Sequence, residues 1–234
     1  MIDRDVLSIL AVPGRGQDER VWGDFLPRLQ QRHEVVTLAG AAELPTRAGD
    51  VILASSDAAS AAVHTARDGR VQALVLLAPD PGEILPEVDL NVDARFPEAV
   101  EMIRFLQEIA HDDPEQRRSA LADRMIRMLG PELPAKDATR LRSMIRDSAD
   151  LMFDPEWQRT SRRAPYADVL SVLEVPALVV AAGEDQLTAA FARALTERAS
   201  RGELVLLDTA LRPYPWLAQP DAAAAAVLRF LAQL

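Results

Sequence analysis

The 234-residue sequence contains no cysteine, which excludes disulfides, thiolate nucleophiles and metal or iron–sulfur sites built on cysteine. Lysine is scarce as well: of the 26 Lys and Arg residues, only Lys136 is a lysine. The net charge is −10 and no basic stripe runs along the chain, so we expect no nucleic-acid partner.

Long apolar runs are also missing. The longest, near residues 73–79 and 175–182, are much shorter than the ~20 residues that a membrane-spanning helix needs. The first residues show no basic segment followed by an apolar one, as a secretory signal would. We therefore expect a cytoplasmic protein with no membrane anchor. With 49% hydrophobic residues, the chain has enough apolar material for one folded domain.

Short apolar runs alternate with helical patterns, which is typical of a parallel sheet covered by helices. The runs predict buried strands at residues 6–12, 34–38, 51–54, 73–77, 177–181 and 203–207. The segments between and after them predict helices at 22–30, 58–67, 189–200 and 221–234. The predicted fold class is α/β, with a mostly parallel sheet of about six strands flanked by helices.

Between residues 84 and 168 the pattern is helical only. Asp113 followed by Pro114 predicts a helix start, and Gly130-Pro131 separates two apolar stripes. The stripes comprise Leu121, Met125, Met128 and Leu129, and then Leu141, Met144, Ile145 and Met152. We predict an all-helical lid at 84–168, inserted after the fourth strand into a continuous core of residues 1–83 and 169–234.

The segment 10–29, LAVPGRGQDERVWGDFLPRL, places a glycine turn directly after the first strand. It resembles the opening of the α/β-hydrolase superfamily, in which this turn supplies one backbone N–H of the oxyanion hole. The resemblance implies that Gly14 is the motif glycine and that the Arg15 N–H points at the substrate. Pro13 stands where the superfamily usually has histidine.

The segment 51–79 resembles the superfamily's strand–elbow–helix–strand unit, normally G-x-S-x-G. Here the elbow is ASSDA at 54–58, with alanine at both glycine positions. Two alignments remain open. Ser56 as the elbow residue needs the smaller deletion, whereas a shift by one residue places Asp57 there, as in the superfamily's epoxide hydrolases and dehalogenases.

The segment 175–234 resembles the end of the superfamily's sheet, and the resemblance implies that Asp185 is the triad acid. The tail PWLAQP at 215–220 is similar to the segment that follows the catalytic histidine, but Pro213 stands nearest to that histidine's position. A serine needs a neighbouring base to attack a carbonyl near neutral pH. No histidine lies beyond His111 in the sequence, so the ordinary relay is missing.

The histidines that remain are poor substitutes. His33 ends a predicted helix at the surface, and His111 lies in the predicted lid, where side chains mostly face solvent. His64 lies eight residues beyond Ser56 along the predicted elbow helix, about 12 Å at 1.5 Å per residue.

We therefore predict an atypical, non-hydrolytic enzyme that performs acid–base chemistry of the lyase, isomerase or cyclase type on a small, largely apolar molecule under the lid. The predicted catalytic residues are Ser56, Asp57 and Asp185, and the predicted oxyanion or substrate-binding residues are Gly14, Arg15, Arg212 and Tyr214. Two alternatives stay open: a ligand-binding pseudo-enzyme, and a slow ester or thioester hydrolase with a substitute base.

Two of these residues also have purely structural explanations. Asp57 is also a favourable acid for a first helical turn, and Asp185 is also a suitable helix cap. No dinucleotide or phosphate-loop fingerprint occurs, so we expect no cofactor, and we predict no metal site. The superfamily's leading antiparallel strands have no counterpart before residue 6, so we expect an open flank of the sheet and a homodimer that covers it.

Overall fold

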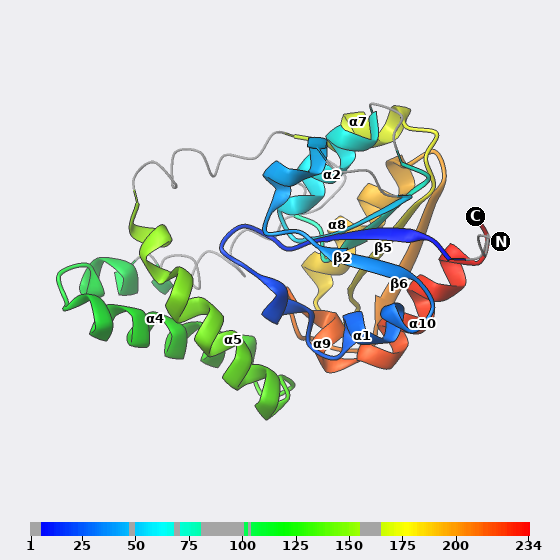
Figure 1. Cartoon of the computed structure of the whole chain (residues 1–234). Helices are drawn as coiled ribbons and strands as arrows, with labels where there is room; N and C mark the ends of the chain where they lie inside the picture. The colour runs from blue at the N-terminus through cyan, green and yellow to red at the C-terminus, as the bar shows by residue number, and fades with distance from the viewer. Residues whose placement is uncertain (1–5, 47–49, 68–70, 81–100, 103, 155–164) are drawn as a thin grey trace.

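Six parallel strands form one sheet at the centre of the protein (Figure 1). The computed structural model describes residues 6–46, 50–67, 71–80, 101–102, 104–154 and 165–234. The strands are β1 (Ser8–Val12), β2 (Glu34–Thr37), β3 (Val51–Ser55), β4 (Ala73–Leu77), β5 (Ala177–Ala182) and β6 (Gly202–Leu207). Every residue of β3, β4 and β5 is buried, as expected for parallel strands with helices on both faces. The predicted α/β class and the six-stranded sheet are confirmed.

The strand order is β2-β1-β3-β4-β5-β6, so the direction of winding reverses at β1. After β1 the chain moves outward to the edge strand β2, and it then crosses back over β1 to β3. The loops that follow β1 and β3 therefore diverge at the carboxyl edge of the sheet. In open α/β sheets such a reversal opens a crevice, which is where ligands bind.

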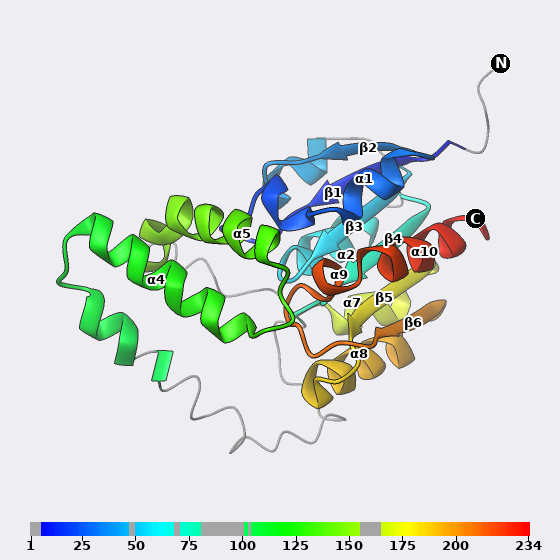
Figure 2. The same cartoon turned by 90° about the horizontal axis from the view of Figure 1, so that it is seen from below.

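Alternating strand residues divide the core into two layers. Ile9, Leu53 and Val75 face one layer, which contains α1 (Phe25–Gln30), α9 (Pro215–Ala218) and α10 (Pro220–Leu231). Leu10, Ile52 and Leu74 face the other, which contains α2 (Ala58–Arg67), α7 (Ala167–Val172) and α8 (Gln186–Arg198). Figure 1 shows these two helical layers on opposite sides of the sheet, and Figure 2 views the sheet from the side of α1, α9 and α10.

The described part of the helical insertion is a hairpin of α4 (Pro114–Leu129) and α5 (Ala135–Ser148), followed by the 3₁₀ helix η3 (Ala149–Phe153). Asp113 caps α4 by accepting the Glu115 N–H at 2.9 Å, as predicted. Most of the predicted apolar stripe residues are buried or half-buried, but Met128 is 47% exposed and does not belong to the core. Residues 84–100 and 155–164 of the predicted lid, and the Met152 side chain, lie outside the described residues.

The hairpin lies beyond the carboxyl ends of the strands (Figures 1 and 2). Arg20, in the 3₁₀ helix η1 (Glu19–Trp22) that follows β1, contacts Ser143 and Asp147 of α5 at 2.9 and 2.6 Å. Glu132, in the turn between α4 and α5, accepts hydrogen bonds from the Thr209 hydroxyl and from the Ala210 N–H beyond β6. The insertion therefore contacts the loops after both β1 and β6.

Several element boundaries in the structure differ from those predicted by the sequence. The predicted helix at 22–30 is divided into η1 and α1, because Gly23 between them takes a positive φ of 55°. The predicted helix at 189–200 begins three residues earlier, since Asp185 caps it. Residues 167–168 of the predicted lid belong to α7, which packs against α2 and α8 of the core. No helix in the described part of the chain is both long and apolar enough to cross a bilayer.

Candidate functional site

The turn between β3 and α2 has the backbone geometry of an elbow. Ser56 has a φ of 51°, in the left-handed region that non-glycine residues rarely enter, and its N–H donates to Leu77 O at 3.0 Å. Such a turn is found where a strand must pass sharply into a helix and expose one side chain. The strained residue is Ser56 rather than Asp57, so the backbone favours the first of the two alignments left open by the sequence.

Alanine replaces glycine at both flanks of the elbow without preventing this turn. Ala54 is fully buried in β3, and Ala58 is 3% exposed at the start of α2. Both side chains are small enough for the helix to approach the strand closely. The substitution of alanine for glycine therefore leaves the elbow geometry intact.

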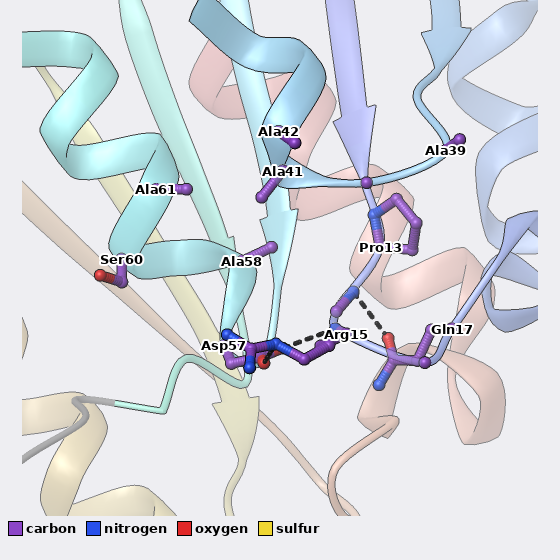
Figure 3. A pocket seen from close by; sticks show the side chains of 13 residues that line it. Pro13, Arg15, Gln17, Ala39, Ala41, Ala42, Asp57, Ala58, Ser60 and Ala61 are labelled. Atoms are coloured by element: carbon purple, nitrogen blue, oxygen red, sulfur yellow. Dashed lines mark hydrogen bonds and ion pairs between the residues drawn. The ribbon is translucent and has the colours of Figure 1, made fainter. Parts of the chain in front are cut away.

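The glycine turn after β1 lies against the first turn of α2. The Arg15 backbone N–H donates to Asp57 Oδ1 at 2.8 Å, and Arg15 Nε lies 3.7 Å from Asp57 Oδ2 (Figure 3). A Cβ at Gly14 would lie 2.8 Å from Asp57 Oδ1, so glycine is what allows the carboxylate to come this close. The N–H that the resemblance assigns to the substrate is thus bonded to the protein's own carboxylate.

Gln17 connects this turn to the C-terminal tail. Its Oε1 accepts from the Gly14 N–H at 2.9 Å and from the Ser55 hydroxyl at 3.2 Å. Its Nε2 donates to the Tyr214 hydroxyl at 3.3 Å. Sequence reasoning missed both Gln17 and Ser55. The only signal was a polar residue within a turn that follows a buried strand, which is too common to single out.

Tyr214 is a buried, neutral phenol. Burial raises its pKa to about 12, the negative charge of Asp57 adds to this shift, and the hydrogen bond from Gln17 opposes it. Its ring lies edge-on to Trp216, with the centroids 5.7 Å apart. Trp216 in turn donates its indole N–H to Val21 O at 3.0 Å, which fixes the tail against the segment after β1.

The second carboxylate, Asp185, has structural partners. It accepts the Thr188 N–H at 2.9 Å as the N-cap of α8, and its Oδ2 lies 2.7 Å from Arg212 Nη1. In a hydrolase triad the acid orients a histidine. Here an arginine pairs with it, and arginine cannot act as a base because it stays protonated.

The three histidines are remote from the elbow. The His33 ring accepts the Leu7 N–H through Nδ1 at 3.3 Å, and burial lowers its pKa, with the nearby charge of Arg32 contributing. His64 lies in the last turn of α2, and His111 is exposed in the helical insertion. Within the part of the chain that the structure describes, the Ser56 hydroxyl forms no hydrogen bond.

An open cleft of about 450 Å³ lies where the strand order reverses (Figure 3). It lies between the loop after β1, the segment that follows β2 and the start of α2, which includes Asp57. Its lining residues are Pro13, Gly14, Arg15, Gly16, Gln17, Ala39, Gly40, Ala41, Ala42, Asp57, Ala58, Ser60 and Ala61. The predicted pocket lay under the helical lid, but no residue of α4 or α5 lines this cleft.

The predicted site residues therefore separate into two groups. Gly14, Arg15 and Asp57 meet at the cleft, whereas Ser56, Asp185, Arg212 and Tyr214 do not line it. In the described part of the connection from β2 to β3, the 3₁₀ helix η2 (Ala41–Thr46) follows the edge strand, and its first residues line the cleft. Among the described residues, no group of three or more His, Asp or Glu side chains is arranged to bind a metal ion.

Together these features define a doubly wound α/β protein with an elbow at the carboxyl edge of its sheet. No protein-family model matches the sequence, and no curated protein matches it either. Solved structures do match.

MenH from S. aureus aligns with a TM-score of 0.66 at 13% identity, over 99% of this chain and 95% of that chain. A malate-bound thermophilic esterase from Thermogutta terrifontis aligns with a TM-score of 0.67 at 18% identity, over 97% and 90%. An alpha/beta hydrolase from Sphaerobacter thermophilus aligns with a TM-score of 0.56 at 15% identity, over 97% and 93%. The chain has the α/β-hydrolase fold, as the sequence predicted.

Proposed function

We propose that this protein is a non-hydrolytic enzyme that binds a small, largely apolar molecule in the cleft and uses the Asp57 carboxylate to move a proton. The observation that supports this function is the position of Asp57: its side chain, 10% exposed, lies at the cleft wall beside Arg15. A positioned carboxylate is a common general base, provided that the reacting proton comes within hydrogen-bond reach.

Acyl transfer to Ser56 is disfavoured for two independent reasons. The serine has no imidazole beside it to accept its proton, since the nearest histidine along the chain is near the end of α2. In addition, the Arg15 N–H that would stabilise an oxyanion is bonded to Asp57. A negatively charged tetrahedral intermediate would therefore meet a carboxylate where hydrolases place hydrogen-bond donors.

Proton transfer needs neither a serine nucleophile nor an imidazole, although an enolate formed in this way still needs a hydrogen-bond donor at its oxygen. Asp57 can accept a proton from a carbon next to a carbonyl group or from a hydroxyl group, and it can return that proton at another position of the same molecule. This sequence of steps describes an isomerisation, and with loss of a leaving group it describes an elimination. The alanine methyl groups opposite Asp57 suit an apolar body, and the Gln17–Tyr214 hydrogen bond positions the turn that carries Arg15.

Hydrogen–deuterium exchange into simple carbonyl compounds tests this function. A panel of small ketones, lactones and enones is incubated with the protein in D₂O, and exchange at the carbons next to the carbonyl is followed by NMR. We expect the protein to accelerate exchange for at least one class, and Asp57→Asn to reduce the acceleration by roughly 10²–10⁴-fold. The matched control is Asp221→Asn, which removes the same charge from an 86%-exposed side chain in α10.

Equal rates for wild type and Asp57→Asn would refute the role of Asp57. A second candidate function, ligand binding without catalysis, is favoured by one observation: both candidate carboxylates are already paired with arginines. That function predicts saturable binding in the cleft, together with no exchange that depends on Asp57.

A further inference from the structure

We infer that Asp57 makes the cleft selective for uncharged ligands over small anions, because its carboxylate occupies the place where an anion would bind. The inference rests on the proposed function, since it concerns the ligand of the same cleft. It assigns to Asp57 a role in specificity that the proton-transfer role does not require.

The Asp57 carboxylate is bonded to the turn after β1 in the way that an anionic ligand would be. Its Oδ1 accepts the Arg15 N–H at 2.8 Å, and its Oδ2 lies 3.7 Å from Arg15 Nε. Gly14 has no side chain to prevent this approach. The carboxylate therefore contacts both the backbone donor and the guanidinium group of Arg15, which are the groups that a carboxylate or phosphate ligand would use.

Among the described residues of the lining, Arg15 is the one cationic group. Of the 13 described residues that line the cleft, nine are alanine, glycine or proline, and the other four are Arg15, Gln17, Asp57 and Ser60. An anionic ligand would have to displace Asp57 from Arg15 or bind beside it, and in either arrangement two like charges lie close together. An uncharged amide, ketone or alcohol meets no such repulsion and can bond to Asp57, Gln17 or Ser60.

The size of the cleft further limits which ligands can bind. About 450 Å³ with a wall of methyl groups and backbone accommodates a small molecule with a short apolar body. The ligand class is therefore a small uncharged molecule with a carbonyl or hydroxyl group at one end.

The test uses two probes of equal length that differ in charge, butanamide and butanoate. Each is titrated into ¹⁵N-labelled full-length protein at neutral pH, and the backbone amide shifts of the cleft residues are followed. In wild type we expect butanamide to shift the cleft signals with a dissociation constant at least roughly tenfold lower than that of butanoate. In Asp57→Asn we expect butanoate to bind at least roughly tenfold more tightly than in wild type.

Two further variants make the result specific. Asp168→Asn removes one negative charge from a 98%-exposed side chain in α7, and it should leave both affinities unchanged. Adding Arg15→Gln to Asp57→Asn should abolish most of the gain in butanoate affinity, because the guanidinium group supplies the attraction.

Wild-type protein that binds butanoate as tightly as butanamide would overturn the inference, even if Asp57→Asn failed to fold. A folded Asp57→Asn variant with no gain in butanoate affinity would overturn it as well. Failure of the proposed function gives a different result: deuterium exchange would persist in Asp57→Asn while its butanoate affinity rose.

Discussion

The two ion pairs at the carboxyl edge of the sheet, Arg15–Asp57 and Arg212–Asp185, differ in what surrounds the carboxylate. Asp57 lies at the wall of a cleft and accepts the N–H of the glycine turn, whereas Asp185 caps α8 and pairs with an arginine of the tail. The first pair lies where a ligand can reach it, and the second stabilises the fold. The elbow geometry at Ser56 is therefore present in this chain without a histidine beside it.

The elbow and the proton relay differ in which residues they require. An elbow needs only small residues at positions that bring helix and strand together, and alanines at 54 and 58 meet that need. The relay needs one particular side chain, imidazole, on the tail. In this chain the tail is held by the packing of Tyr214 against Trp216 and by the hydrogen bond from the Trp216 indole to Val21 O.

The largest expected effect is a loss of stability when the anchor of the C-terminal tail, Trp216, is removed. Trp216 is fully buried and donates its indole N–H to Val21 O. We expect Trp216→Ala to lower the free energy of unfolding by about 3–5 kcal/mol, because it leaves a large cavity and an unpaired carbonyl group. Urea denaturation followed by circular dichroism measures this loss. A cost below ~1 kcal/mol would show that the tail does not depend on this anchor.

The next prediction contrasts the two carboxylates directly. We expect Asp57→Asn to reduce turnover by roughly 10²–10⁴-fold, and Asp185→Asn to change it by less than about threefold, since only Asp57 lines the cleft. The deuterium-exchange rate of one substrate is measured with each variant and compared with the wild-type rate. Comparable losses in the two variants would mean that Asp185 also acts in the reaction.

Stability at high pH should report the burial of Tyr214. Its pKa is about 12 in the folded protein against 10.0 for an ordinary tyrosine. Between these values the unfolded chain has released the phenolic proton and the folded chain has kept it. The free energy of unfolding should therefore be unaffected below pH 10 and should fall as the pH rises from 10 to 12, by roughly 3 kcal/mol in all.

Tyr214→Phe, which cannot ionise, provides the control for this experiment. Thermal denaturation of both proteins from pH 8 to pH 12 measures the difference. Parallel curves for the two proteins would mean that the phenol is not buried in the folded state.

The smallest effect concerns the cap of α8. Asp185→Ala should lower the free energy of unfolding by about 1 kcal/mol, through loss of the hydrogen bond from the Thr188 N–H. Asp185→Asn keeps a capping oxygen and should cost less, because asparagine caps helices as well as aspartate does. Equal losses in the two variants would assign the stability to the ion pair with Arg212 rather than to the cap.

The sheet was predictable from the sequence because its strands are continuous apolar runs separated by turns and amphipathic helices. Predicted helix boundaries were wrong where one residue's backbone conformation sets the end of the helix. At Gly23, for example, the positive φ ends η1. The Asp113 cap was predictable because proline is common at the first position of a helix and an acidic residue just before it can accept a backbone N–H.

The site was less predictable because its contacts join residues that lie far apart in the sequence. The Arg15–Asp57 hydrogen bond spans 42 residues and the Gln17–Tyr214 hydrogen bond spans 197. No local pattern reports such pairings. The cleft lies where the strand order reverses at β1, a position at which open α/β sheets commonly bind ligands, and the order of the strands cannot be read from a local pattern.

Ser56 occupies the elbow without a neighbouring base, and the Arg15 N–H is bonded to Asp57 rather than open to an oxyanion. Intact-protein mass spectrometry after incubation with a fluorophosphonate and with p-nitrophenyl butyrate shows whether this serine reacts. The protein should keep its mass, and no nitrophenolate should be released beyond the spontaneous rate. An adduct on Ser56 that disappears in Ser56→Ala would contradict the claim.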